Sequence, residues 1–203
     1  MSNSASKKLA LVKALINEFK LEEALQLVKD IEQRKNLTND EVLRTQAYTA
    51  RIHFYLGLFD IALKIAEDLY QKSQKNKAPL YSLDSLFIKI FLFYIQENEE
   101  WHEILEQLED LFNSISREES FEFQEREALL LIWKGGSNFS IGNTDLALDY
   151  YDKSLTLFKR IDPHSISIPH VLSLMAYPYL LKGELTLAIE CNEKALSLIP
   201  KGD

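Results

Sequence analysis

The sequence has 203 residues, of which 46% are hydrophobic and 27% are charged, so its composition is that of one folded domain rather than of a disordered chain. The formal charge of -8 at pH 7 argues against nucleic acid and against an anionic membrane surface as partners, because both are bound through Lys and Arg. A single cysteine, Cys191, excludes an internal disulfide and favours a reducing compartment, so we expect a cytoplasmic protein.

The start of the chain does not resemble a secretory signal, because Lys13 and Glu18 interrupt its apolar positions. The most apolar run, residues 86–95, is much shorter than the roughly 20 residues that cross a bilayer, and Lys89 interrupts it. We therefore expect no membrane partner.

Taken in chain order, the apolar residues recur with helical spacing, first over residues 9–16 and then over residues 21–31. No segment alternates with period two for long enough to predict a strand. Helix breaks are expected at 36–39, 76–79, 114–120 and 162–169, where Asn, Pro and Ser gather. The segment 82–96 is apolar nearly all round, which predicts a central buried helix; the alternative is an interface.

The helical pattern repeats about every 40 residues. A small or apolar anchor follows each predicted turn by five residues, and the anchors are Ala24, Ala62, Ile104, Ala147 and Ala188. The turns themselves are predicted at Phe19-Lys20, Gly57-Leu58, Glu99-Glu100, Gly142-Asn143 and Gly183-Glu184. Glycine suits such a reversal because it adopts positive φ without a Cβ clash. Thr144 and Asp145 are expected to cap the helix that follows Gly142.

Three units carry a recognisable set of residues. The second has Ala50, Gly57, Phe59 and Ala62, the fourth has Gly135, Gly142, Ala147, Tyr151 and Leu155, and the fifth has Ala176, Tyr179, Gly183, Ala188, Ala195, Leu196 and Pro200. With these residues the chain resembles the tetratricopeptide repeat (TPR) family over nearly its whole length. The resemblance implies an all-α, right-handed superhelical solenoid of about five antiparallel helix–turn–helix repeats. It also implies a single domain, 1–203, with units at about 5–38, 43–76, 85–118, 128–161 and 169–202. Longer helices or longer links would account for the long period.

No spacing of residues predicts catalysis. His164 and His170 flank a linker and could share a metal only with a third ligand, which the sequence does not supply. We expect no metal, no cofactor and no enzymatic activity. Cys191 is predicted to pack as a small buried residue. The acidic run 97–110 is predicted to be a solvated helix face that could attract a basic partner.

In the TPR family the first helix of each hairpin lines a concave groove that holds a peptide or a helix. The matching face of the second unit is predicted to carry two arginines and two tyrosines, which suit carboxylates and amphipathic contacts. The candidate partner-binding residues are Arg44, Tyr48, Arg51 and Tyr55, then Lys89, Phe93 and Gln96 of the third unit, Phe139 of the fourth and Tyr177 of the fifth. The alternative is that the arginines pair with acids of the adjacent hairpin.

These residues predict a non-enzymatic scaffold or adaptor for protein–protein interaction, whose partner is a protein or peptide with an acidic or acidic-hydrophobic motif. One alternative is a regulatory module that senses a ligand or peptide by changing its superhelical pitch. Another is a self-associating structural module, a homo-oligomer formed through the apolar segment 86–95 or through an exposed repeat end. Pro178 is expected to bend the last hairpin's first helix near its C-terminal end.

Overall fold

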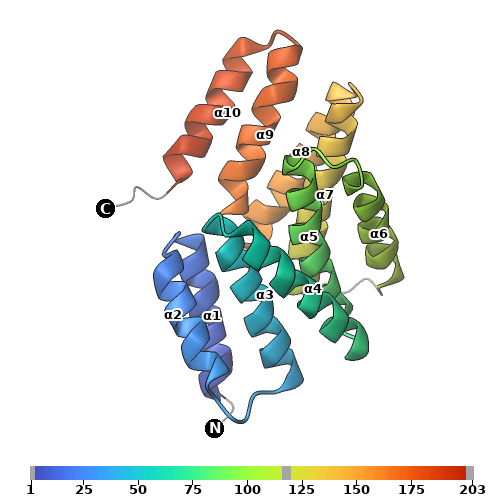
Figure 1. Cartoon of the computed structure of the whole chain (residues 1–203). Coiled ribbons are helices and arrows are strands. Elements are labelled where there is room, and N and C mark those ends of the chain that lie inside the picture. Colours follow the sequence, from blue (N-terminus) through green and yellow to red (C-terminus); the bar gives the residue numbers. More distant parts are fainter. Residues whose placement is uncertain (1–2, 116–119, 200–203) are drawn as a thin grey trace. The chain divides into compact units, whose positions relative to one another are not determined.

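The computed structural model describes residues 3–115 and 120–199, and every regular element in these two ranges is an α-helix (Figure 1). The helices are α1 (Asn3–Asn17), α2 (Leu21–Glu32), α3 (Asn39–Tyr55), α4 (Phe59–Lys75), α5 (Pro79–Ile95), α6 (Trp101–Ser114), α7 (Phe121–Ser140), α8 (Thr144–Ile161), α9 (Ser167–Leu181) and α10 (Leu185–Leu198). They pair in chain order as antiparallel hairpins. The predicted all-α solenoid of helix–turn–helix repeats is confirmed.

The long repeat period comes from long helices. Helices α3, α4 and α5 each have 17 residues, α8 has 18 and α7 has 20. The predicted units 43–76, 85–118 and 128–161 therefore begin several residues after the first helices that they should contain. The predicted ends at 118 and 202, and Pro200, lie outside the described residues.

Six of the described helices end in the same kind of turn. The turn residue has positive φ, and the amide of the next residue donates to a carbonyl in the last helical turn, as from Leu58 N to His53 O at 2.9 Å. Six positions share this backbone: Phe19, Gly57, Lys77, Glu97, Gly142 and Gly183. The positive-φ residue of the third hairpin is Glu97, two residues before the predicted turn at Glu99-Glu100. Glu99 and Glu100 form a second turn before α6, closed by the hydrogen bond from the amide of Trp101 to the carbonyl of Asn98 at 3.2 Å.

Among the helix starts that the structure describes, two are capped by side chains. Thr38 caps α3 in a reciprocal capping box with Glu41, and Ser120 accepts from the amide of Phe123 at 3.3 Å at the start of α7. The expected caps at Thr144 and Asp145 lie within α8 instead, because that helix begins at Thr144 after Asn143, whose side chain makes no capping hydrogen bond.

The chain forms two compact units, residues 1–115 and 116–203. In unit 1, α3 packs against α1, α2, α4 and α5, so the three first helices α1, α3 and α5 are successive neighbours. Helix α5 has the most continuous burial, from Tyr81 to Leu86 and at Ile88, Ile90 and Leu92. The prediction that the apolar segment 82–96 is a central buried helix is confirmed for most of its length, since only its last turn has exposed apolar side chains.

In unit 2, α9 packs against α7, α8 and α10. Its core gathers Tyr151, Leu155 and Phe158 of α8 around Val171 and Met175 of α9. Ser154, buried between helices, donates to the carbonyl of Ala128 at 2.7 Å and ties α8 to α7. Pro178 lies inside α9, one turn before its end, where the amide of Lys182 donates to its carbonyl at 3.0 Å.

Candidate peptide-binding surface

One face of α3 carries the predicted line of arginines and tyrosines. Arg44, Tyr48, Arg51 and Tyr55 recur at helical spacing and are all half-buried. Tyr48 and Tyr55 pack on the cluster formed by α1 and α2. Arg44 lies on the other side, beside Tyr81 of α5. The line therefore follows the part of α3 that borders both neighbouring first helices.

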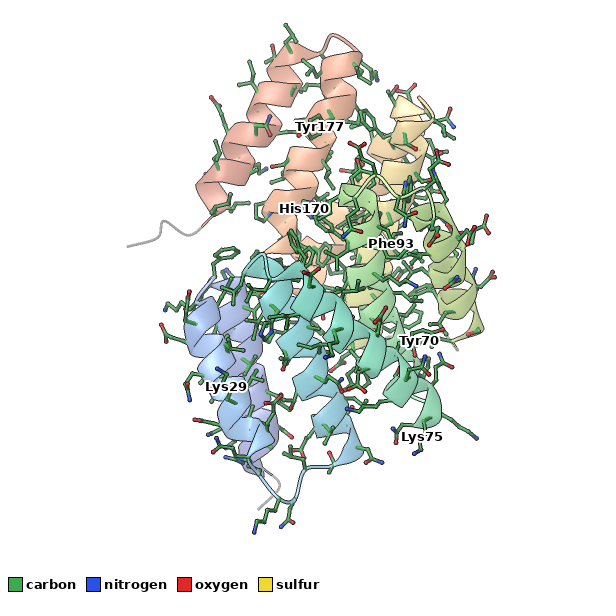
Figure 2. The ribbon with its side chains drawn as sticks, in the orientation of Figure 1. Lys29, Tyr70, Lys75, Phe93, His170 and Tyr177 are labelled. Atoms are coloured by element: carbon green, nitrogen blue, oxygen red, sulfur yellow. The ribbon has the colours of Figure 1, made fainter. Side chains whose placement is uncertain are left out.

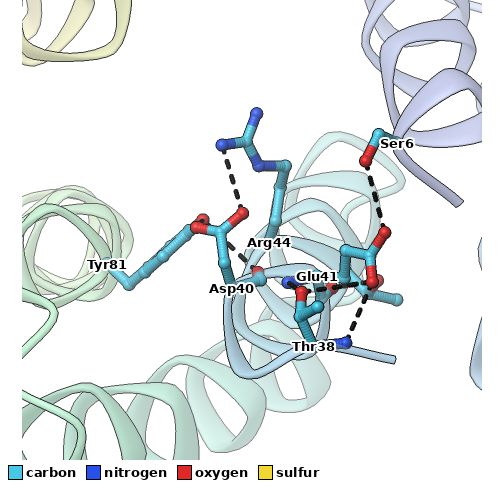
Figure 3. A network of polar contacts seen from close by, with 7 residues as sticks. Ser6, Thr38, Asp40, Glu41, Arg44 and Tyr81 are labelled. Atoms are coloured by element: carbon cyan, nitrogen blue, oxygen red, sulfur yellow. Dashed lines mark hydrogen bonds and ion pairs between the residues drawn. The ribbon is translucent and has the colours of Figure 1, made fainter. Parts of the chain in front are cut away.

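Arg44 is held by a small polar network that Figure 3 shows. Its Nη2 atom lies 3.4 Å from Oδ2 of Asp40, one turn earlier on α3. The phenol of Tyr81 donates to the other oxygen of Asp40. Burial raises the pKa of Tyr81, and the bond to Asp40 raises it further, so the phenol remains a donor. Asp40 thus helps to fix the guanidinium between α3 and α5 from its own helix.

A second network in the same view joins α1 to α3. Ser6 Oγ donates to Glu41 Oε1 at 3.2 Å, and the amide and hydroxyl of Thr38 donate to Glu41 Oε2 at 2.9 and 3.1 Å. The backbone bond from Thr38 is the largest of the effects that lower the pKa of Glu41. Glu41 therefore both caps α3 and links it to the preceding hairpin.

Tyr55 lies in a chain of aromatic contacts. The ring of Tyr55 is 6.1 Å from that of Phe19 and 5.5 Å from that of Phe54, and Phe54 meets Phe91 of α5 edge to face at 4.7 Å. Phe19, the turn residue with φ 59, has a half-exposed ring. These rings fix the position of Tyr55 and extend the face toward α5.

Two polar residues of α1 complete the face and were missed by the sequence analysis. Phe19 and Gly57 are the matching turn residues of the first two hairpins. Counted back from them, Lys13 occupies the place of Arg51, and Asn17 occupies the place of Tyr55. Because α1 and α3 are packed neighbours of the same direction, the two cations lie on the same side of the layer. The spacing of the turns contained this signal. We call Lys13, Asn17, Arg44, Tyr48, Arg51 and Tyr55 the basic-aromatic face.

The residues predicted on α5 have a different orientation. In the register set by Glu97, the counterparts of Arg51 and Tyr55 are Phe91 and Ile95. Lys89 and Phe93 are displaced from these positions by two residues, which turns a side chain by about 200° around the helix. Lys89 Nζ instead lies 5.2 Å from the ring centre of Phe93, one turn along α5. Gln96, just past the helix, is exposed. The structure does not bring these three residues onto the basic-aromatic face.

Phe139 and Tyr177 belong to unit 2, and there they lie together. Their ring centres are 6.4 Å apart, and Phe139 also packs on the core of that unit. Tyr177 is 58% exposed on α9 (Figure 2). Unit 2 therefore has an aromatic pair of its own, and a groove continuous over all nine predicted residues stays a prediction.

Other candidate chemistry is sparse. In the described ranges no three His, Cys, Asp or Glu side chains are grouped so that they could hold a metal ion. Cys191 is half-buried on the unit 2 core, and burial raises the pKa of its thiol, as for a packing residue. Within the same ranges, no helix has both the length and the apolar character needed to span a membrane.

Comparison with known proteins identifies solved structures that have a similar fold. No protein-family model matches the chain, and no curated protein matches it in sequence. Among solved structures it is similar to BtubC (BKLC) from P. vanneervenii, with a TM-score of 0.54 and 14% identity over 97% of this chain and 88% of that one. It is also similar to a kinesin-light-chain type protein from Podosopora anserina with nearly identical TPR-like repeats, with a TM-score of 0.52 and 17% identity over 98% and 96% of the two chains. The chain has the fold of TPR-like repeat proteins.

Proposed function

We propose that the protein is a non-enzymatic interaction scaffold whose basic-aromatic face binds an acidic peptide segment of a partner protein. Helical repeat folds present extended surfaces that are generally used for protein interactions. The observation that carries the proposal is the alignment of Lys13 with Arg51 on neighbouring first helices, in a chain whose formal charge is -8. Partner carboxylates are attracted to such a cationic site, and Tyr48 and Tyr55 supply apolar contact beside it.

The geometry suggests how the peptide binds. Arg44 is already oriented by Asp40, so part of its side-chain entropy is lost before binding. Tyr48 and Tyr55 are packed against α1 and α2, which keeps their rings in place. Much of the face is thus organised in the absence of the partner, a condition that favours affinity.

The test begins with peptides selected on the purified protein from a random display library. We expect enrichment of peptides that contain two or more Asp or Glu residues near an apolar residue. A selected peptide is then titrated by fluorescence anisotropy. Lys13→Glu and Arg51→Glu should each weaken it at least tenfold, because each turns a favourable charge contact into a repulsive one.

The matched control is Lys64→Glu on α4, which makes the same change of charge at an exposed position outside the face. It should leave the affinity nearly unchanged. Circular dichroism establishes that the three variants are equally helical. If Lys64→Glu and Arg51→Glu lose equal affinity, the effect comes from the overall charge and not from the face, which contradicts the proposal. Selection of peptides without Asp or Glu would also reject it.

A further inference from the structure

The outer face of α10 is an apolar stripe. In unit 2, α10 packs against α9 alone among the described helices (Figure 1). Leu185, Ile189, Leu196 and Ile199 recur at intervals of one helical turn or its multiples, and each is more than half exposed. Four large exposed apolar side chains on one side of α10 and its C-cap, interrupted by Asn192, are more than the scattered exposure that is usual for a soluble protein.

The equivalent positions on α8 are buried by another helix, and that helix shows what kind of surface fits the α10 stripe. Leu155 and Leu196 occupy the same place after their turn glycines, Gly142 and Gly183. Leu155 is 5% exposed, whereas Leu196 is 70% exposed. The next matching pair differs in the same way, since Phe158 of α8 is 1% exposed and Ile199 is 51% exposed. On α8 these positions are buried with α9, the first helix of the following hairpin.

A first helix with a suitable open side is present in the chain itself. Helix α1 packs against α2 and α3 through Leu9, Val12 and Ile16. Its opposite side carries Leu11, which is 52% exposed, between the exposed Ala10 and Ala14. Leucine flanked by alanines gives an apolar surface that another helix can approach closely.

The charges at the two ends of this side suit the helix dipole of α10. Exposed Lys7 lies near the start of α1, and exposed Glu18 follows its last residue. A first helix covers the preceding second helix in the antiparallel sense, as α9 covers α8. Seated in this way on α10, α1 brings Lys7 to the C-terminal end of α10 and Glu18 to its N-terminal end. The helix dipole favours a cation at the former and an anion at the latter.

We propose that the chain self-associates head to tail, with the α10 stripe of one copy covered by the outer side of α1 of a second copy. This contact joins two different surfaces, so each bound copy still offers one of them and the assembly can extend. It uses the side of α1 opposite to its core, which borders Lys13 and Asn17 of the basic-aromatic face. The contact itself is apolar and is tested without any peptide, so the proposal does not depend on peptide binding.

The first experiment follows mass against concentration by sedimentation equilibrium, from micromolar to millimolar protein. We expect the average mass of the wild type to rise above that of the monomer, and Leu196→Glu to remain monomeric. Leu198→Glu is the matched control, because Leu198 is 47% exposed on the same helix but outside the stripe. It should associate like the wild type. Circular dichroism checks the fold, and Leu196→Ser replaces Leu196→Glu if that variant loses helix.

The second experiment tests direction. Leu11→Glu blocks the α1 side, and Leu196→Glu blocks the α10 stripe. Each variant alone should be monomeric, while their mixture should form a one-to-one dimer and nothing larger, because each retains the surface that the other has lost. Self-association of Leu11→Glu would show that the stripe pairs with another surface and would overturn the proposal. A wild type that is monomeric throughout the concentration range would overturn it as well.

Discussion

At the scale of single residues, Gly135 shows how closely two helices of the fourth hairpin approach. A Cβ at this position would lie 2.5 Å from Cε1 of Tyr151, inside van der Waals contact. Tyr151 is almost fully buried and has little room to move. We expect Gly135→Ala to lower the free energy of unfolding by about 1–2 kcal/mol, as overpacking outweighs the better helix propensity of alanine. Chemical denaturation followed by circular dichroism measures this.

The neighbouring glycine supplies the control. At Gly136 the nearest atom to an added Cβ is Oη of Tyr151 at 3.7 Å, which is ordinary contact. Gly136→Ala should therefore raise the stability by about 0.5–1 kcal/mol, since alanine is the better helix former. Opposite signs at adjacent positions would establish the close approach of α7 and α8, and equal effects would contradict it.

Glu41 makes the stability depend on pH. Its pKa in the folded protein is below the usual value, chiefly through the hydrogen bond from the amide of Thr38. A lowered folded pKa stabilises the protein above the unfolded pKa, and this stabilisation is lost as the pH falls through the folded value. We expect the wild type to lose melting temperature between about pH 5 and pH 3, and Glu41→Gln to lose less over that range.

A control variant that loses a different carboxylate separates the effect of Glu41 from the effect of removing any one acidic group. Glu67→Gln changes an exposed residue of α4 and should leave the acid dependence of the wild type intact. Removing the α1 hydroxyl with Ser6→Ala should give a smaller change in the same direction as Glu41→Gln, because it removes one of the bonds to the carboxylate. An unchanged pH profile in Glu41→Gln would mean that other groups govern acid unfolding.

At the scale of helices and turns, the backbone of the turn decides which residues are tolerated. Gly57 has φ +73, and no atom lies within 4 Å of an added Cβ. Gly57→Ala therefore incurs only the conformational cost of a left-handed residue, and we expect a loss of about 1 kcal/mol in stability. Lys77 has φ 52 and already bears a Cβ, so Lys77→Ala should change the stability little. Urea denaturation of both variants tests the pair, and a large loss in Lys77→Ala would mean that its side chain contributes to the fold.

The sequence predicts helices well because each second helix buries one clear stripe, as Ala24, Val28 and Ile31 do on α2. It predicts turns well where glycine marks the positive φ. In the third hairpin Glu97 adopts this backbone instead, and its residue type gives no signal. The turn was therefore expected two residues too late.

That small error has a large effect on the candidate surface. A helix changes the direction of a side chain with every residue, so a register error of two moved Phe93 onto the place of Arg51 in the predicted face. The contacts of Arg44 and Tyr48 place the predicted face of α3 beside α5 and α1, and its role in binding stays a prediction. The place of Lys13 follows only from counting back from Phe19, because its residue type alone does not mark a face.

At the scale of the whole molecule, the charge distribution bears on partner choice. The acids outnumber the basic residues, 31 to 23, yet Lys13, Arg44 and Arg51 share one face. An acidic chain repels acidic proteins in general, so a partner with a short acidic segment can reach the face only where its remaining surface is neutral or basic. This makes the surroundings of the binding segment part of the specificity.

The division into two compact units leads to a prediction about the cooperativity of unfolding. Unit 1 has three hairpins, and its described residues form several core clusters, whereas unit 2 has two hairpins. Repeat hairpins bury their apolar faces by stacking, and about three are needed for a stable array. We expect residues 1–115 expressed alone to unfold cooperatively in urea, and residues 116–203 alone to be only marginally folded.

The full chain then distinguishes one domain from two. If unit 2 depends on unit 1, as the predicted single domain 1–203 implies, unfolding followed at Trp133 of unit 2 should coincide with unfolding followed at Trp101 of unit 1. Each tryptophan is observed alone after replacing the other by Phe. Coincident curves, together with a weak isolated unit 2, would mean that the repeats cooperate across residue 115. A stable fragment 116–203 with a separate transition would instead make the units independent domains.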